Sequence, residues 1–333
     1  MPLDRKLILS LVLTSLAGPV MAEVYDLPAA GNDVVGAVTY TTSRAADTLL
    51  DIARRHGLGY EDIVRANPEV DTWLPGEGTQ IVLPTRYILP PGPRRGVVLN
   101  LAEYRMYYFP QAKNGEDPVV MTYPISIGRM DWETPLGLTQ VISKVRNPSW
   151  YPPESVRQEH LADGDPLPRV VPPGPQNPLG DFAMRLGLPG YLIHGTNRPA
   201  GVGMRVTHGC IRMFPEDIEY VFEHIPVKTP VRIINEPVKF GWDGDDLVLE
   251  VHRTLERPLE EGSEAEPVDG DVVEEAPVAD ALTTLTMKFI AVTRERTGQL
   301  DWLAAESLVD KADGIPATTG FAIKNAATSA AFE

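Results

Sequence analysis

The chain has 333 residues, of which 43% are hydrophobic and 23% charged. This mixture fits about two soluble domains and excludes a wholly disordered chain and a multispan membrane protein. The net charge of −16 makes nucleic acid an unsuitable partner, because its phosphates would be repelled. A single cysteine, Cys210, excludes an intramolecular disulfide and a cysteine-rich zinc ribbon.

Residues 1–22 have the pattern of a secretory signal peptide. Arg5 and Lys6 precede an apolar-rich run of 11 residues, and Ala22 supplies a small residue for cleavage. An uncleaved anchor is the alternative, but the run is too short to span a bilayer as a helix. No later segment reaches the ~18 apolar residues that a transmembrane helix needs. We therefore expect an exported protein without an integral membrane segment after signal cleavage. The resemblances found further along the chain imply that it is wall-associated in the periplasm.

Residues 39–84 predict a small α+β domain with a strand, two short helices and a second strand. Asp47-Thr48 can cap the first helix, and Asn67-Pro68 ends the second. With Leu74-Pro75-Gly76 and Ile81-Val82-Leu83-Pro84, this order resembles the LysM domain, which binds the sugar backbone of cell walls. Ala46 stands where that family usually has glycine. A plain spacer domain is the alternative.

The chain from 95 to 238 follows a proline-rich linker and predicts the main domain. Many short β-type runs and one helix beginning at Pro215 favour a mainly β fold, a β-sandwich or partly open barrel with one packed helix. The expected strands are 97–101, 104–109, 119–125, 137–142, 191–194 and 231–234.

The segment 148–178 carries nine prolines and no periodicity. A segment of this kind is more often functional than a plain connector. Trp150, Tyr151 and Arg169 would suit a lid over a peptide groove, and a surface loop is the alternative.

Differences in composition divide residues 239–333 into four parts. Residues 239–255 predict a strand extension, and 256–280 an acidic linker, because Glu256 to Asp280 contains ten carboxylates against one arginine. Residues 281–312 have helical spacing and predict a short helical appendage, which is followed by a tail over 313–333. No chemistry is assigned to this region.

One group of residues has the composition of a nucleophilic catalytic site. His194 ends an apolar strand, and Cys210 lies in a turn with His208, Gly209 and Arg212. A thiol attacks as its thiolate, so Cys210 needs a base and a positive environment. His208 is only two residues from Cys210, so its ring could contact the sulfur only at an unfavourable angle. His194 comes from another strand and can approach the sulfur directly. The amides of Gly209 and Cys210 could stabilise an oxyanion. We predict acyl transfer through a thioester.

Two alternatives are weighed against this site. A lone cysteine can be a small buried apolar residue. His194, His208 and Cys210 could also bind zinc, although no fourth ligand stands out. The remaining histidines are expected on the surface or in packing contacts: His56, His160, His224 and His252.

The residues from about 96 to 238 resemble the L,D-transpeptidase catalytic domain, also called YkuD. The motif is His194-Gly195, a gap, and Thr207-His208-Gly209-Cys210-Ile211-Arg212, with Thr134-Pro135-Leu136-Gly137 upstream. The resemblance implies that Cys210 is the nucleophile and His194 the general base and later acid. It also implies that the Gly195 carbonyl orients His208, and that Arg212 shapes the turn and the acyl-donor pocket.

The resemblance also implies the substrate. The donor would be a tetrapeptide stem of peptidoglycan, attacked between the diamino acid and D-Ala, and an amine would take the acyl group. No cofactor and no metal are expected, and the partners would be stem peptides and glycan. The expected substrate contacts are Arg212, Thr207, Arg205, Trp150 and Tyr151.

Further motifs narrow the likeness to a Gram-negative subgroup with an N-terminal LysM module. They are Asn177-Pro178-Leu179-Gly180, Gly201-Val202-Gly203-Met204-Arg205 and Glu236-Pro237-Val238. Members attach a Braun-type lipoprotein through a lysine amine or make 3-3 crosslinks between diamino acids. Two other functions stay open. One is a hydrolase that cuts the lipoprotein–wall link with the same Cys/His pair, and the other is a noncatalytic wall-binding protein.

Overall fold

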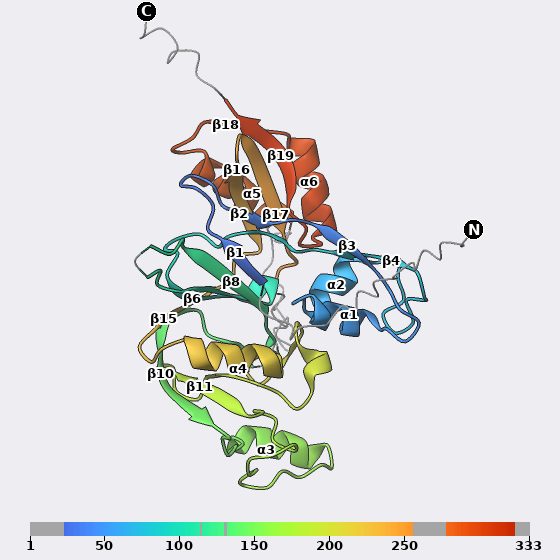
Figure 1. The fold of residues 1–333 in the computed structure, drawn as a ribbon, viewed down its shortest axis with the longest axis vertical. Coiled ribbons are helices and arrows are strands. Elements are labelled where there is room, and N and C mark those ends of the chain that lie inside the picture. Colours follow the sequence, from blue (N-terminus) through green and yellow to red (C-terminus); the bar gives the residue numbers. More distant parts are fainter. Residues whose placement is uncertain (1–22, 114, 130–131, 256–277, 324–333) are drawn as a thin grey trace, which may run out of the picture.

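A computed structural model describes residues 23–113, 115–129, 132–255 and 278–323 (Figure 1). The expected signal peptide and the acidic linker up to residue 277 lie outside the described residues. The fold is mainly β, as predicted. A large central sheet is flanked by a small unit with two helices on one side and by a second α/β unit built from the end of the chain.

The central sheet has nine strands and curls into a half-barrel, which confirms the expected partly open barrel. The chain enters it at β1, which pairs antiparallel with β8. Two neighbouring pairs, β15 with β6 and β12 with β14, run parallel. In spatial order the strands are β1 (Glu23–Asp26), β8 (Val119–Pro124), β7 (Arg105–Phe109), β6 (Gly96–Asn100), β15 (Pro230–Ile234), β10 (Gly137–Arg146), β11 (Phe182–Leu186), β12 (Leu192–His194) and β14 (Ile211–Arg212).

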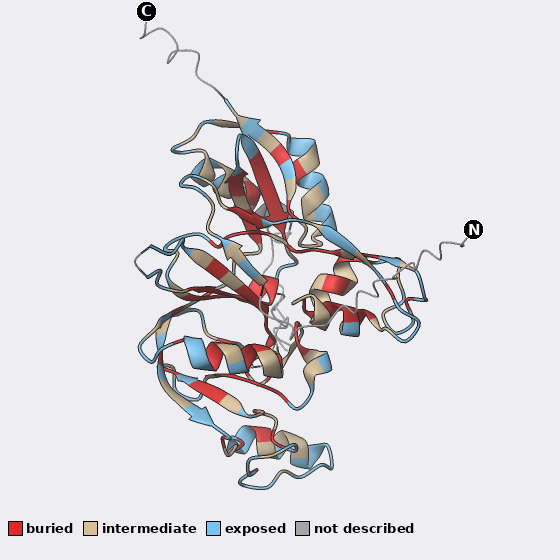
Figure 2. Ribbon diagram, viewed as in Figure 1, coloured by how far each residue is buried: buried red, intermediate tan, exposed pale blue. Residues whose placement is uncertain are grey.

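Helix α4 (Pro215–His224) covers one face of this sheet (Figure 1). It begins where predicted, because Pro215 suits the first helical position and two acidic residues favour its first turn. Its buried Ile218, Val221 and Phe222 pack into the main core with the inward side chains of the strands. In Figure 2 buried and exposed stretches alternate along this helix, as expected for a helix with one buried face.

A second helix in this domain, α3 (Glu154–Ala162), was not predicted, whereas α4 is the helix packed into the core of the sheet, as expected. Val156 is its one buried residue, and the apolar spacing that reveals an amphipathic helix is therefore lacking.

The expected lid, segment 148–178, leaves the sheet and returns to it as a closed loop. Its ends are joined by paired hydrogen bonds between Trp150 and Val171 and by the buried Asn177 amide, which donates to the Pro148 carbonyl over 2.7 Å. Short elements nearby are η1 (Leu101–Glu103), η2 (Pro199–Gly201) and the parallel pair β9 (Ile127–Gly128) and β13 (Arg205–Thr207).

Residues 39–83 form the expected strand–helix–helix–strand unit, which we call the βααβ unit. Thr48 caps the first helix in a capping box with Asp51. Leu49, Ile52 and Ile63 form its small core with the second strand. The elements are β3 (Thr39–Thr42), α1 (Leu49–Arg55), α2 (Tyr60–Ala66) and β4 (Gln80–Leu83), and a further pair, β2 (Val34–Gly36) with β5 (Arg86–Ile88), leads into and out of the unit.

The end of the chain forms a four-stranded sheet with two helices, so the expected helical appendage and tail were wrong as separate parts. The strand in the supposed tail pairs with the strand extension, Ala317 facing Leu249. Of this strand only Thr319 is buried, which hid it from pattern analysis. The elements are β16 (Val238–Asp243), β17 (Asp246–Val251), α5 (Val278–Val292), β18 (Gly298–Leu300), α6 (Trp302–Lys311) and β19 (Ala317–Ala322).

A buried ionic cluster joins this C-terminal unit to the central sheet. The Lys239 ammonium lies 2.8 Å from Glu103 and 2.9 Å from Glu250, and Glu250 also contacts His252 over 2.7 Å. The ligand atoms of Glu103, Glu250 and His252 are close enough together for a metal ion. Because the Lys239 ammonium pairs with both carboxylates, the arrangement is that of an internal ion network.

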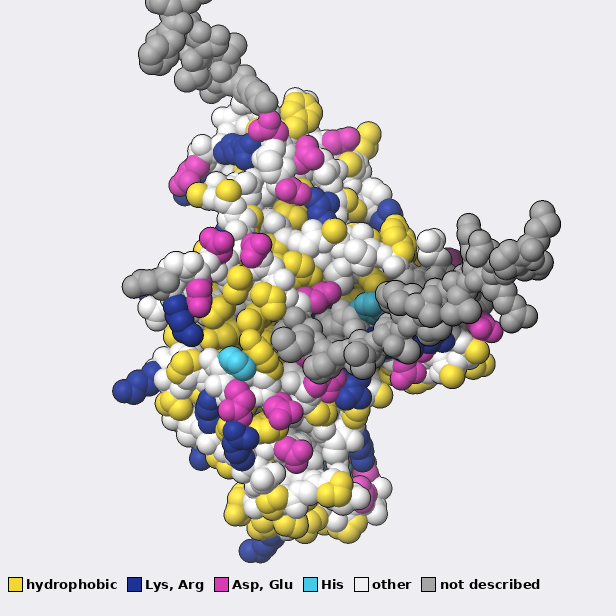
Figure 3. Space-filling view, in the orientation of Figure 1, with side chains coloured by type: hydrophobic (Ala, Val, Ile, Leu, Met, Phe, Trp, Pro, Cys, Tyr) yellow, Lys and Arg dark blue, Asp and Glu magenta, His cyan; other side chains and the backbone are white. Residues whose placement is uncertain are grey.

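The surface mixes both charges. On the face shown in Figure 3, basic side chains lie among acidic ones and form no continuous stretch. Within the described residues, none of the helices has the length and apolar character needed to cross a membrane.

Candidate active site

Four adjacent strands form the floor of the site on the sheet face opposite α4. Paired residues on neighbouring strands present their side chains on the same face. Pairing places Val145, Ala183, His194 and Arg212 in one row across β10, β11, β12 and β14. The next row, one pleat away on the same face, holds Ser143, Arg185 and Leu192, and Cys210, the residue before β14, continues this row. The sheet thus brings His194 and Cys210 to one face from two parallel strands.

Cys210 sits at the end of a tight turn. Gly209 has φ +95°, a conformation that favours glycine, and an added Cβ would lie 2.9 Å from the Tyr191 ring. The Thr207 hydroxyl closes the turn by donating to the Cys210 carbonyl over 2.6 Å. The buried Thr134 hydroxyl donates to the Gly209 carbonyl over 2.9 Å. The Thr134 motif therefore fixes the turn that carries the thiol, a role that sequence reasoning missed.

His194 is oriented by its own neighbour. Its Nδ1 donates to the Gly195 carbonyl over 2.6 Å, so the expectation that this carbonyl orients His208 was wrong. The bond leaves Nε2 as the unprotonated nitrogen of a neutral ring. Burial, reinforced by the Arg212 cation, lowers the pKa of His194 to about 4, against the opposing effect of the Gly195 and Leu179 carbonyls. At neutral pH the imidazole is therefore free to accept a proton.

The thiol is protonated in the resting site. Burial raises the pKa of Cys210, against smaller opposite effects of the Leu192 backbone and the Arg212 cation. Its Sγ lies 3.6 Å from the Gly190 carbonyl, and among its described contacts there is no hydrogen bond to His194. A neutral thiol and a neutral imidazole on the same sheet face fit general-base activation and not a preformed ion pair.

His208 is held from the lid. Its Nε2 lies 2.9 Å from Glu159 of α3 and 3.4 Å from Arg129, and its ring packs edge-on against Trp132. Arg129 also donates to Glu159 over 2.6 Å. These hydrogen bonds hold the pKa of Glu159 below its usual range, Arg129 contributing most. His208 therefore connects the nucleophile turn to α3, and Glu159 is a site residue that gave no sequence signal.

A groove of about 910 Å³ lies between the lid and the sheet, with Cys210 and His208 on its wall. Trp150 and Tyr151 line it from the lid, where the sequence placed them. A peptide-sized groove beside the thiol excludes the alternative of an inert core cysteine, because Cys210 is only half-buried and opens onto it.

The other expected substrate contacts lie elsewhere. Thr207 is buried in the turn, and Arg205 donates to the Gly128 carbonyl over 3.0 Å. Neither residue lines the groove, and their contact with substrate stays a prediction. Arg212 lies in the His194 row, and its Nε is buried without a hydrogen-bond partner among the described residues. Burial and the neighbouring Arg198 lower the pKa of Arg212. An unpaired donor atom on a half-buried cation favours an anionic ligand.

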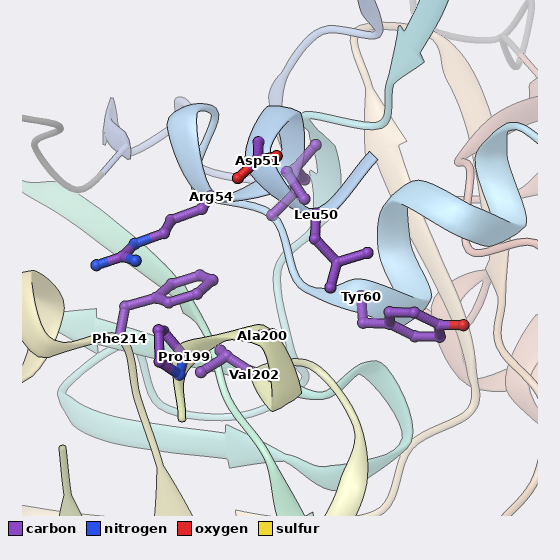
Figure 4. A pocket seen from close by; sticks show the side chains of 10 residues that line it. Leu50, Asp51, Arg54, Tyr60, Pro199, Ala200, Val202 and Phe214 are labelled. Atoms are coloured by element: carbon purple, nitrogen blue, oxygen red, sulfur yellow. The ribbon is translucent and has the colours of Figure 1, made fainter. Parts of the chain in front are cut away.

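The βααβ unit is docked onto the loop between His194 and Cys210. Arg54 pairs with Glu216 through two hydrogen bonds of 2.7 and 2.8 Å, and it extends over the Phe214 ring (Figure 4). The Tyr60 amide donates to the Val202 carbonyl over 2.9 Å. A cavity of about 120 Å³ remains at this junction, away from the thiol. Figure 4 shows its two sides, with Leu50 and Tyr60 above and Pro199, Ala200 and Val202 below.

Comparisons with known proteins point to one family. Residues 94–233 match the YkuD family, the L,D-transpeptidase catalytic domain. The "Probable L,D-transpeptidase YcfS" of Escherichia coli strain K12 is 38% identical over 260 residues, which cover 76% of this chain and 80% of that protein. The "Probable L,D-transpeptidase ErfK/SrfK" of Salmonella typhimurium is 42% identical over 241 residues, which cover 71% of this chain and 76% of that protein.

Among solved structures, an L,D-transpeptidase from Mycobacterium smegmatis matches with a TM-score of 0.32 and 20% identity, over 45% of this chain and 61% of that chain. The identification rests on the curated relatives, whose similarity extends well beyond the catalytic domain. This chain belongs to the L,D-transpeptidase family of peptidoglycan enzymes.

Proposed function

We propose that the protein transfers the acyl group of a tetrapeptide stem through a thioester on Cys210. The observation that carries this proposal is the placement of Cys210 and His194 on one sheet face, beside a peptide-sized groove. In the first half-reaction, the Cys210 thiol turns from the Gly190 carbonyl toward His194 and gives its proton to Nε2. The sulfur then attacks the carbonyl of the diamino acid.

The intermediate carries its negative charge on the former carbonyl oxygen. The Gly209 and Cys210 amides at the turn are the donors proposed to stabilise it. The C–N bond to D-Ala then breaks, and the amine leaves with the proton held by His194. A thioester remains on Cys210, and it conserves the energy of the broken amide bond.

In the second half-reaction, an amine attacks the thioester and restores the thiol. The proposed acceptors are the lysine of a Braun-type lipoprotein or the side-chain amine of a second diamino acid. His194 takes the proton from the attacking amine and returns it to sulfur. The same ring carries the proton in both half-reactions, and the Gly195 carbonyl holds Nδ1 so that Nε2 remains the reacting nitrogen.

We propose periplasmic action at the wall, with the βααβ unit as the glycan-binding part. The strand–helix–helix–strand order supports this, as do two exposed apolar side chains before β4, Trp73 at 61% and Leu74 at 81% exposure. Cosedimentation with purified sacculi tests it. Trp73→Ala should reduce binding of the full chain, while Tyr40→Ala, an exposed aromatic on β3, should leave it unchanged.

The transfer is tested with the purified protein, a tetrapeptide donor and separate amine acceptors. Mass spectrometry of the products should show the acyl group joined to an amine and free D-Ala in equal amount. A product in which water alone has replaced D-Ala, whatever the acceptor, would identify a hydrolase and overturn the transfer. Formation of the same products by Cys210→Ala would overturn the thioester route.

A further inference from the structure

The groove beside Cys210 contains one fixed charge. Among its described lining residues, the sole lysine, arginine or carboxylate side chain is Arg185 on β11. The rest of the lining is mostly proline, glycine, aromatic and aliphatic, with Cys210 and His208 near one end. The chain as a whole has a net charge of −16, whereas the described lining of this groove carries one positive side chain and no carboxylate. The groove therefore favours anionic groups.

Arg185 lies in the row of the nucleophile. It faces Leu192 on β12, and continuing the Ile193–Ile211 pairing by one residue sets Leu192 beside Cys210. Two strand spacings separate the Arg185 backbone from Cys210, about 10 Å. An extended arginine side chain spans most of this distance, so a peptide bound at the thiol comes within reach of the guanidinium.

Among the residues that the structure describes, none is a partner of this guanidinium. Within the described residues, Arg185 is exposed and takes part in neither an ion pair nor a side-chain hydrogen bond. Arg146 is different. It belongs to the same pair of strands but lies on the opposite face, where it pairs with Glu223 and stacks on Phe222.

A guanidinium among apolar side chains fits one class of ligand group. Its planar fork matches a carboxylate through two parallel hydrogen bonds, and the surrounding apolar surface strengthens them by excluding water. A tetrapeptide stem carries free carboxylates on its side chains and at its D-Ala terminus. We propose that Arg185 binds one of these carboxylates and makes the enzyme select acidic acyl donors over amidated ones.

This inference deepens the proposed function and rests on it for the identity of the donor. The test therefore begins with a measurement that needs no transpeptidation. Cys210 is the sole cysteine, so alkylation reports on this groove alone. Iodoacetate is an anion, and iodoacetamide is its neutral analogue. The rate of alkylation by iodoacetate divided by the rate with iodoacetamide should fall severalfold in Arg185→Gln. The same ratio should stay unchanged in Arg146→Gln.

The second measurement compares donors. The matched set consists of the free tetrapeptide and versions amidated singly at each carboxylate. We expect one amidation to lower kcat/KM of the wild-type enzyme by about tenfold, mainly through KM. Arg185→Gln should lose most of this difference, and Arg185→Lys should keep part of it, because the charge remains without the fork. Arg146→Gln should behave as wild type.

The outcomes separate the two proposals. An alkylation ratio that is the same in wild type and Arg185→Gln overturns the inference, as does an active Arg185→Gln that keeps the full discrimination. A wild-type enzyme that transfers no donor, while Arg185→Gln still lowers the alkylation ratio, overturns the proposed function and leaves Arg185 as an anion-binding residue of the groove.

Discussion

Glu159 of the lid helix and His208 of the nucleophile turn lie 2.9 Å apart, between Oε2 and Nε2. They come from segments about 50 residues apart in the chain, and Arg129 completes the contact by donating to Glu159 over 2.6 Å. The lid is thus fastened to the turn that carries the thiol. Its position and the position of Cys210 depend on each other.

The first prediction concerns this contact. Glu159→Gln should weaken it, because a neutral amide cannot replace the ion pair with Arg129. We expect a severalfold higher KM for the donor and faster alkylation of Cys210 by a bulky maleimide. Glu154→Gln is the control, since Glu154 lies on the same helix and pairs only with neighbours on α3. Equal behaviour of the two variants would mean that the contact does not hold the lid.

The second prediction concerns the resting thiol. Since burial raises the pKa of Cys210, its alkylation by iodoacetamide should be slow at pH 7 and rise only above the range of an ordinary cysteine. His194→Ala should change this profile little and yet reduce donor turnover by a factor of about 10²–10⁴, the usual contribution of a general base. A rapid alkylation plateau below pH 7 would show a preformed thiolate and contradict the general-base route.

The third prediction concerns the docked βααβ unit. Gly203 has φ +86°, and a Cβ there would lie 2.4 Å from the Gly59 Cα. Gly203→Ala should push this unit away from the loop between His194 and Cys210 and lower kcat. Gly78→Ala is the matched control, because Gly78 has φ +83° with nothing within 4 Å. The two variants carry similar backbone strain, so a kcat loss shared by both would be a strain effect and would argue against coupling.

The fourth prediction concerns stability and pH. Burial raises the pKa of Asp217 on α4 from 3.8 to about 8. Above pH 3.8 the unfolded chain loses a proton that the folded chain keeps, so stability falls as pH rises toward 8. The change is at most about 1.4 kcal/mol per pH unit.

Asp217→Asn should flatten the decline of Tm between pH 6.5 and 8. This window also avoids His194, whose lowered pKa costs stability only as the pH falls below 6.5. Glu219→Gln, at an exposed position of the same helix, should keep the slope of the wild-type protein. An unchanged slope in Asp217→Asn would place the titrating group elsewhere.

The parts of the site that could be predicted are those encoded locally. His194 and the turn around Cys210 follow from a strand and a glycine-bearing motif, and α4 follows from Pro215 and its apolar spacing. Glu159 could not be found, because its helix buries only Val156 and thus shows no pattern. The Gly195 carbonyl was assigned to His208, because hydrogen-bond partners depend on ring orientation and not on sequence distance.

The rest of the fold was harder to predict, because it depends on pairing between strands that are far apart in the sequence. The central strands were predictable because their buried faces alternate or are continuously apolar. β19 lies about 70 residues from its partner β17 and has only Thr319 buried, so neither proximity nor pattern indicated the pairing. The C-terminal sheet could therefore be recognised only from the structure.

The most direct test of the central claim is the intact mass of the protein after mixing with a tetrapeptide donor, without an acceptor. The wild-type chain should gain the mass of the donor less D-Ala, and peptide mapping should place this group on Cys210. Cys210→Ala should gain nothing, and His194→Ala should react far more slowly. A wild-type chain that never forms this adduct, or an adduct that persists in Cys210→Ala, would contradict the account.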